Sequence, residues 1–277
     1  MNTSTTKKPH WQDRHRHVSH GRIAWYGDPG NEQYWYEYGK ARLTPDYYAS
    51  ADANDLTSDQ LGKVLLQAMS PRGLHLEAGC GAGYWVAALR HHGLMIEGIE
   101  YSPDLVELVH TANPQLPVRQ GNALYIDSPD NHYDTYLSIG VVEHRVEGLE
   151  PFLSEAYRVL KPGGKILISV PYFGPLRVLK SRLSMYDLQP PDLPFFQYGF
   201  TSNEFTNHLQ KAGFSIEKVQ VLYPHRLLLE EISFYRWILN KPWGPFVKRW
   251  AVSLLWNRDG HMLLAVGNKS ISQSTLY

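Results

Sequence analysis

The sequence predicts an α/β fold with a doubly wound, mostly parallel sheet, and two observations support this. From residue 73 to residue 170, short apolar segments rich in β-branched residues alternate with amphipathic segments of helical spacing. A turn that contains three glycines directly follows the first apolar segment, at the position where open α/β sheets bind their ligands. An alternation of this kind places helices on both faces of a parallel sheet.

The chain begins with a segment that we expect to lie outside this sheet, residues 1–55. Its polar, His-rich start, residues 1–30, is predicted to be poorly ordered, and order is expected from the aromatic segment 31–43, which would cap a substrate site. No cysteine or carboxylate completes a coordination shell around His15, His17 and His20, so we predict no metal site there.

Residues 56–277 are predicted to form one ligand-binding domain with insertions at about 172–200 and 224–259. A helix over 56–68, with Thr57 or Ser58 as its cap, precedes the first strand. The expected strands are 73–78, 94–100, 116–121, 133–142, 165–170, 215–223 and 261–269. The expected helices between them are 84–93 closed by Gly93, 103–112 capped by Ser102, 150–160 ended by the turn KPGG, and 201–214 capped by Thr201.

The composition is that of a globular protein without a charged macromolecular partner. The 277 residues are 43% hydrophobic, and 27 Lys and Arg balance 27 Asp and Glu. This balance gives no electrostatic reason to expect nucleic acid, so we expect a small-molecule substrate. The single cysteine, Cys80, fits a reducing compartment, and no apolar run reaches the ~18 residues of a membrane span. We therefore expect a cytoplasmic protein; the sequence makes no prediction of its oligomeric state.

The glycine turn, in LHLEAGCGAGYW, indicates an adenosine cofactor other than a dinucleotide. The dinucleotide fingerprint G-x-G-x-x-G requires a glycine where Tyr84 or Val86 stands. The acid at the end of the next strand, Glu100, can accept hydrogen bonds from both hydroxyls of a ribose. Bare backbone at the turn admits the close approach of a nucleotide-like group.

Five ordered motifs resemble the class I S-adenosylmethionine-dependent methyltransferases, in particular the branch called type 11 that modifies small molecules. The motifs are HLEAGCGAG, IEGIEYS, QGNALYI, YDTYLSIGVVEH and EAYRVLKPGGKILISVP. The resemblance covers roughly residues 60–222 and the final strand. It implies the seven-stranded Rossmann-like methyltransferase fold and S-adenosyl-L-methionine as the cofactor.

The same resemblance implies the cofactor-binding residues. Those that would contact the methionine half are Glu77, which orients the ammonium, Gly79, Cys80 and Gly81, with backbone contacts from Ser138 and Ile139. Those that would contact the adenosine half are Glu100 on the ribose, Tyr101 on the adenine face, and Asn122 and Ala123 on the adenine edge. The commoner pattern has Asp where Asn122 stands, so we expect changed affinity with binding retained. The alternatives are solvent-facing strand ends for Glu77 and Glu100, and ordinary packing for Tyr101.

His144 is the candidate catalytic base, because it follows the fourth strand and an imidazole suits proton removal from a hydroxyl near neutral pH. The competing interpretation is that His144 pins the loop 143–148. On the first interpretation, the acceptor is an oxygen of a small molecule or sugar-containing precursor. The alternatives are an N- or C-methyltransferase acting on a lipid-like or natural-product substrate, and a cofactor-binding protein without turnover.

The acceptor pocket should be built from segments outside the shared motifs. The Trp-rich stretch 234–256 has Phe246, Trp250 and Leu254 at helical spacing after Pro245. Three interpretations remain open: a core helix over the sheet, a lid over the substrate, and a peripheral membrane contact, since Trp beside Lys and Arg suits lipid headgroups. In the other insertion, the cations Arg177, Lys180 and Arg182 could meet a phosphate or carboxylate of the substrate or remain solvated.

Overall fold

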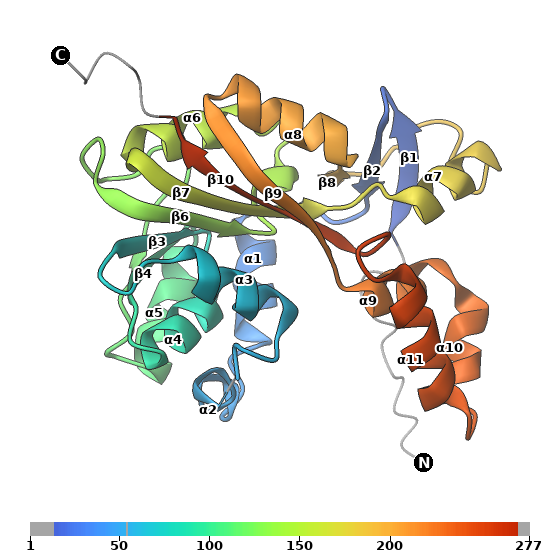
Figure 1. The fold of residues 1–277 in the computed structure, drawn as a ribbon, viewed down its shortest axis with the longest axis horizontal. Coiled ribbons are helices and arrows are strands. Elements are labelled where there is room, and N and C mark those ends of the chain that lie inside the picture. The colour runs from blue at the N-terminus through green and yellow to red at the C-terminus, as the bar shows by residue number, and fades with distance from the viewer. Residues whose placement is uncertain (1–13, 54, 271–277) are drawn as a thin grey trace.

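The computed structural model describes residues 14–53 and 55–270. Its main sheet has seven strands, in chain order β3 (Leu74–Ala78), β4 (Met95–Glu100), β5 (Val118–Gln120), β6 (Tyr133–Ile139), β7 (Leu160–Pro171), β9 (Phe214–Leu222) and β10 (Met262–Lys269). They lie in the order β5-β4-β3-β6-β7-β10-β9 (Figure 1). β10 runs antiparallel to both of its neighbours, β7 and β9, and the other adjacent pairs of this sheet are parallel. The predicted seven-stranded, mostly parallel sheet is confirmed.

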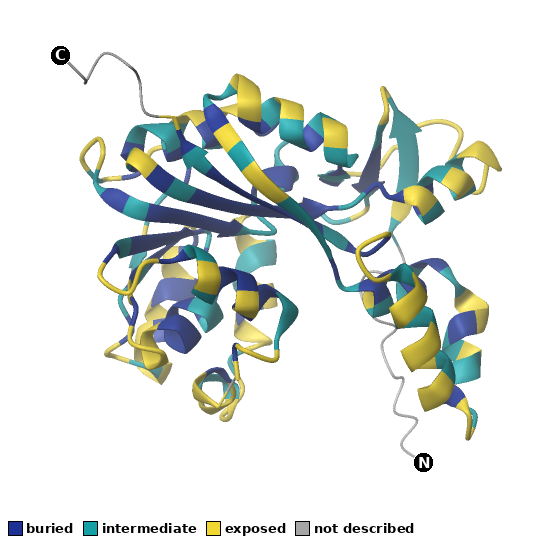
Figure 2. Ribbon diagram, in the orientation of Figure 1, coloured by how far each residue is buried: buried dark blue, intermediate teal, exposed yellow. Residues whose placement is uncertain are grey.

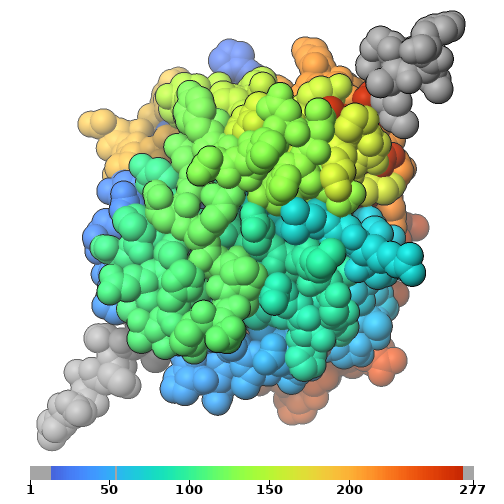
Figure 3. All heavy atoms as spheres, turned by 90° about the vertical axis from the view of Figure 1, so that its left-hand side faces the viewer, coloured from blue at the N-terminus to red at the C-terminus, as the bar shows by residue number. Residues whose placement is uncertain are grey.

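Helices cover both faces of this sheet, as the alternation in the sequence predicts. One face packs against α3 (Gln60–Ala68), α4 (Tyr84–His91) and α5 (Pro103–Ala112). The other packs against α6 (Glu150–Val159) and α8 (Ser202–Lys211). The central strands are buried along most of their length, whereas the helices expose their outer sides (Figure 2). Seen from the side, the middle of the chain forms one continuous surface, cyan through yellow-green in Figure 3.

Most predicted boundaries hold within two residues, and the helix caps explain the main exception. The hydroxyl of Ser102 accepts a hydrogen bond from the amide of Leu105, and that of Thr201 caps α8. The cap of α3, however, is Asp59, whose carboxylate accepts from the amides of Leu61 and Gly62. The hydroxyls of Thr57 and Ser58 instead donate hydrogen bonds to Asp55. The predicted helix is present but begins at Gln60, and the prediction of Thr57 or Ser58 as its cap was wrong.

Three further boundaries differ from the prediction by three residues or more, and one of them is the end of α8, which lies at Lys211 instead of residue 214. The fourth strand ends at Ile139 instead of residue 142, because the chain turns into a 3₁₀ helix, Val142–His144. The segment KPGG does not separate α6 from the next strand. It belongs to β7, which starts at Leu160.

A second, three-stranded antiparallel sheet corrects the expectation for the N-terminal segment. Its strands are β1 (His15–Ser19), β2 (Arg22–Tyr26) and β8 (Phe195–Gly199), in that order. Order therefore begins well before residue 31, and the expectation for residues 1–13 lies outside the described residues. The physical reason is that Ile23 and Trp25 are buried against Phe173 and Phe196, contacts that local sequence cannot reveal.

The remaining helices flank this second sheet and the carboxyl edge of the main one. They are α1 (Glu32–Lys40), α2 (Tyr47–Asp52), α7 (Pro175–Arg182), α9 (Pro224–Glu231), α10 (Ser233–Leu239) and α11 (Gly244–Leu255). The core-helix interpretation of the Trp-rich stretch was wrong, because Phe246 and Trp250 of α11 are 73% and 61% exposed. Within the described ranges, no helix combines the length and the apolar character needed to cross a membrane.

A buried ion cluster joins α7 to α9. Arg177 is fully buried, and its guanidinium donates to Glu231 at 2.9 Å and to Glu230 at 3.0 Å. Lys180 and Arg16 each donate to Glu231 at 2.7 Å. Arg177 is therefore neither solvated nor free to hold a substrate phosphate, in contrast to both sequence interpretations.

Candidate active site

A cavity of about 1190 Å³ opens at the carboxyl ends of the parallel strands. It exceeds the 300–1,000 Å³ typical of pockets for one small ligand, so it has room for a cofactor and an acceptor. Most of the predicted site residues line it: Glu77, Gly79, Cys80, Gly81, Glu100, Tyr101, Asn122, Ala123, Ile139 and His144. The side chain of Ser138 does not, because it is fully buried and its hydroxyl donates to the carbonyl of Ala78 at 3.2 Å.

The three glycines of the turn are required for two different reasons: contact with the protein itself, and space for a ligand. A Cβ on Gly79 would lie 2.6 Å from Val141, and one on Gly83 would lie 2.7 Å from Leu116, so the protein itself requires these two glycines. Gly81 also has a positive φ, +54°, but a Cβ there would meet no protein atom within 4 Å. Its bare face is turned to open space, which fits a ligand lying against the backbone.

Glu100 lies beside this turn. One carboxylate oxygen accepts from the amide of Gly81 at 2.9 Å and the other from the amide of Ser102 at 3.0 Å. Burial raises the pKa of Glu100, and these backbone amides oppose the rise. Glu100 is only 6% exposed, so it is not the solvent-facing strand end of the alternative interpretation. Each oxygen keeps a lone pair that can accept from a ribose hydroxyl.

Glu77 is the group on the cofactor side that most needs a ligand, because part of its carboxyl lacks a hydrogen-bond partner. It is buried, and its Oε2 atom has no hydrogen-bond partner among residues 14–53 and 55–270. Burial raises its pKa to about 8, and the charge of Glu100 adds to the rise. A buried carboxyl with an unpartnered oxygen is costly unless a ligand satisfies it. A cationic ammonium fits this position, because it would donate to Oε2 and stabilise the ionised carboxylate.

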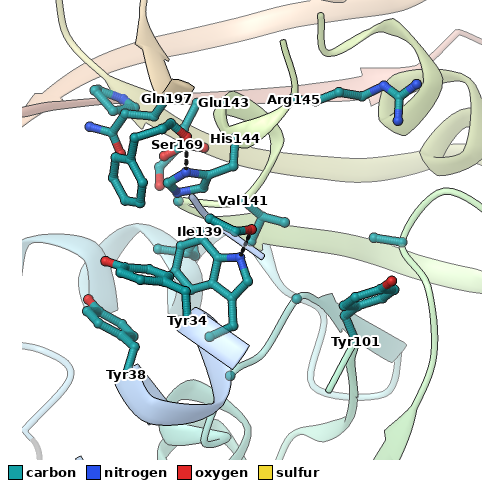
Figure 4. A pocket seen from close by; sticks show the side chains of 18 of the residues that line it. Tyr34, Tyr38, Tyr101, Ile139, Val141, Glu143, His144, Arg145, Ser169 and Gln197 are labelled. Atoms are coloured by element: carbon teal, nitrogen blue, oxygen red, sulfur yellow. Dashed lines mark hydrogen bonds between the residues drawn. The ribbon is translucent and has the colours of Figure 1, made fainter. Parts of the chain in front are cut away.

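Two of the three predicted adenine contacts, Tyr101 and Asn122, differ in whether their side chains are already hydrogen-bonded. Tyr101 is half exposed at the rim of the cavity (Figure 4), where a ring could lie against it. The side-chain oxygen of Asn122 already accepts from the amide of Leu124 at 2.9 Å, closing the local turn. The amide NH2 of Asn122 is then the group left to contact a base edge.

Cys80 is a buried thiol, and its environment opposes ionisation. Burial raises its pKa well above the usual value, and Glu77 and Glu100 add to the rise. Its sulfur fills the space beside Gly98, where a Cβ would lie 2.6 Å from Sγ. Cys80 is therefore a packing residue of the cofactor wall, because a thiol that stays protonated is a poor nucleophile.

The acceptor side of the cavity has aromatic walls from α1 and β8 (Figure 4). Tyr34, Trp35 and Phe196 pack edge-on or tilted against one another. The indole of Trp35 donates to the carbonyl of Gly30 at 2.8 Å, which fixes its ring. The aromatic segment 31–43 thus contributes to the cavity wall.

His144 lies between the rings of Trp35 and Phe196, each 4.6 Å away between centroids. Its Nδ1 is 2.8 Å from the carbonyl oxygen of Phe196, which can only accept, so Nδ1 carries the proton. Burial lowers the pKa of His144 to about 4, so the ring is neutral near pH 7 with Nε2 unprotonated. The same hydrogen bond ties the loop that follows β6 to β8.

Sequence reasoning missed two polar residues on this side of the cavity. Glu143 is buried with an unpartnered Oε2, and burial raises its pKa to about 8. Ser169, near the end of β7, is buried with an unpartnered hydroxyl. Their positions, after β6 and near the end of β7, were the available signal, but only the structure shows that both are buried with one unpartnered oxygen each.

The lid interpretation of the Trp-rich stretch was wrong. No residue from 232 to 258 lines the cavity. The wall near this insertion comes instead from α9, through Arg226 and Glu230, and from His261 before β10. The stretch 234–256 therefore lies outside the cavity.

These features together define the class: a Rossmann-like protein with an adenosine-cofactor site at its first glycine turn. The profile of the family described as "Methyltransferase domain" matches residues 76–168. A "Probable S-adenosylmethionine-dependent methyltransferase" of Mycolicibacterium smegmatis is 32% identical over 145 residues, 51% of this chain. The match covers 52% of that relative, about half its length.

A relative of the same description from Mycobacterium tuberculosis is 28% identical over 228 residues, covering 76% of this chain and 78% of the relative. Among solved structures, an S-adenosylmethionine-dependent methyltransferase from Thermotoga maritima superposes with a TM-score of 0.52 at 20% identity. The match covers 86% of this chain and 97% of that one, and supports the fold. Residues 76–168 therefore form a methyltransferase domain, and the chain is similar to class I S-adenosylmethionine-dependent methyltransferases, which gives S-adenosylmethionine as its cofactor.

Proposed function

We propose that this methyltransferase acts on a hydroxyl of a small molecule or sugar-containing precursor. When bound, S-adenosylmethionine supplies a methyl group activated on a sulfonium. The chain's part is to hold an acceptor in line with that methyl, exclude water and take the acceptor's proton. The observation that carries the proposal is His144: a neutral imidazole at the cavity wall whose Nε2 can accept a proton.

His144→Ala should lower kcat at least ~100-fold and leave the affinity for S-adenosylmethionine unchanged, because it removes the proton acceptor from the acceptor side alone. His144→Asn isolates the role in proton transfer, since its amide can still donate to the carbonyl of Phe196 but has no basic nitrogen. Steady-state kinetics and calorimetry check both. His110→Ala is the control, because His110 also contacts a backbone carbonyl, that of Val118, but lies outside the cavity.

Full activity in His144→Asn would assign His144 to holding the loop instead of to proton transfer. The pH profile separates the roles as well. Because the pKa of His144 is lowered to about 4, protonation should reduce kcat/KM only near pH 4, not near the ordinary histidine value. An acid limb that remains unchanged in His144→Asn would contradict the assignment, because it would belong to another group.

We also propose that Glu77 pairs with the ammonium of the cofactor. Since its pKa is raised to about 8, Glu77 is protonated in the free protein near pH 7 and must ionise to form this pair. Cofactor binding should therefore release about one proton near pH 7, and affinity should rise with pH until about 8. Calorimetry in buffers of different ionisation enthalpy measures the release.

Glu77→Gln should bind more weakly and release almost no proton. Glu143→Gln is the matched control, because Glu143 is equally buried, with a pKa also raised to about 8, but lies on the acceptor side. Equal proton release in wild type and Glu77→Gln would refute the pairing.

The second candidate is an N- or C-methyltransferase acting on a lipid-like or natural-product substrate. The observation that favours a lipid-like acceptor is the exposed aromatic and basic surface of residues 234–256, through which a peripheral membrane contact is also proposed. A cytoplasmic location is proposed as well, supported by the single cysteine, Cys80.

Transfer of radiolabelled methyl from S-adenosylmethionine to panels of hydroxyl and amine acceptors, and to cell extracts, tests the function. Label in a hydroxyl acceptor supports the proposal, whereas label only on nitrogen or carbon supports the second candidate. Cofactor binding without transfer to any acceptor would indicate a binding protein without turnover.

A further inference from the structure

The helical hairpin formed by α10 and α11, residues 233–255, turns its apolar side chains away from the protein. Of the twelve residues of α11, only Gly244 is buried. Seven large apolar side chains in and beside the hairpin are exposed: Phe234, Trp237, Trp243, Phe246, Trp250, Leu254 and Trp256. The two helices lie side by side at the lower right of Figure 1, at the end of the molecule away from β4.

All the charged side chains of this hairpin are positive. Residues 232–258 contain no Asp or Glu, although acids and bases balance over the whole chain. The basic residues of the stretch are Arg236, Lys241, Lys248, Arg249 and Arg258. They stand among the aromatic side chains. The ammonium of Lys241, for instance, lies 4.4 Å from the centre of the Trp237 ring.

We propose that the α10–α11 hairpin binds the surface of an anionic lipid membrane. Exposed Trp and Phe side chains would enter the headgroup region, where aromatic rings with one apolar and one polar side are stable. The lysines and arginines would pair with lipid phosphates while their alkyl stems cover apolar surface. Contact with the membrane is peripheral, since no described helix is long and apolar enough to cross it.

Charge complementarity selects this occupant over a second copy of the chain. Two identical hairpins packed face to face would bring like charges together with no carboxylate from either hairpin to neutralise them. An anionic bilayer offers phosphate to every basic residue and an apolar boundary to every aromatic one. Large exposed apolar patches on soluble proteins mark interaction sites. The positive charge of this patch favours an anionic lipid surface as its partner.

Docking at this surface also orients the cavity. The helix α9 packs against both α10 and α11, and its residues Arg226 and Glu230 line the cavity. A membrane-bound chain therefore holds one wall of its cavity a single helix away from the lipid. This consequence rests on the proposed function, whereas lipid binding itself does not.

Vesicle flotation with the full chain tests the proposal. The protein should float with vesicles of equimolar phosphatidylglycerol and phosphatidylcholine, bind at least ~10-fold more weakly to pure phosphatidylcholine, and dissociate at high salt. The double variant Phe246→Ser, Trp250→Ser should lose vesicle binding. The charge variant Lys248→Glu, Arg249→Glu should lose binding to the anionic vesicles.

Matched controls lie on other surfaces. Met95→Ser removes an exposed apolar side chain at the start of β4, and Lys63→Glu, Lys211→Glu reverses two exposed charges on α3 and α8. Both should float like wild type, and cofactor affinity should be unchanged in every variant.

Absence of binding to the anionic vesicles, or equal binding by the hairpin variants, would overturn the proposal. A dimer in solution that Trp250→Ser abolishes, without vesicle binding, would identify a second copy as the occupant. Methyl transfer is measured separately, so its failure leaves this result unaffected.

Discussion

Gly81→Ala should weaken S-adenosylmethionine binding by about tenfold to a hundredfold, because the added methyl group occupies the space the cofactor needs. No protein atom lies within 4 Å of that position, so the fold loses only the preference of glycine for φ +54°, about 1–2 kcal/mol. Calorimetry gives the affinity, and chemical denaturation gives the free energy of unfolding.

Gly93→Ala provides the matched control. Gly93 also has a positive φ, +83°, and a Cβ there would also meet nothing within 4 Å, but it lies after α4 and outside the cavity. The two variants should lose similar stability, and only Gly81→Ala should lose affinity. Equal affinities in both variants would mean that the cofactor does not lie against the bare face of Gly81.

Glu231→Gln should lower the free energy of unfolding by about 3–5 kcal/mol, because it leaves buried positive charge without its partner. Glu231 accepts from Arg177, Lys180 and Arg16 at once. Its pKa is lowered to about 2, mainly by the charges of Arg177 and Arg16 acting against desolvation. The stability it contributes is therefore present above about pH 4.5 and lost as pH falls toward 2. Urea denaturation at several pH values measures both effects.

An exposed pair supplies the comparison. Lys165 on β7 and Glu217 on β9 lie 2.6 Å apart, with side chains 30% and 43% exposed. Glu217→Gln should cost no more than ~1 kcal/mol, because solvent screens the pair. If the two glutamine variants were equally stable, the buried cluster would contribute nothing specific to the fold.

The fold was predictable wherever the local hydrophobic pattern and the order of the elements along the chain determine the structure. Strand and helix periodicity placed all seven strands, and the caps Ser102 and Thr201 began their helices as expected. The cavity could also be predicted, because the glycine turn and the end of β6 fix where the parallel strands point. Nearly all of the predicted residues line it, although the separate roles given to Glu77, Glu100 and His144 remain predictions.

What the sequence could not reveal depends on contacts between distant segments. The pairing of β2 with β8 joins the start of the chain to the first insertion, so the early residues were expected to lack order. Arg177 and Glu231 are buried together although each alone is typical of a surface. The stripe of Phe246 and Trp250 has the spacing of a core helix, and only the structure shows that it faces outward.

The pairing of β2 with β8 also has a consequence for how the protein is made. The β1–β2 hairpin leaves the ribosome long before β8 is synthesised, and until then the edge of β2 has no partner. The cofactor turn and its neighbouring strands are complete by Ile139, so they can assemble while synthesis continues. The aromatic wall around Phe196 can therefore close only after β8 is synthesised, later than the glycine turn and its neighbouring strands.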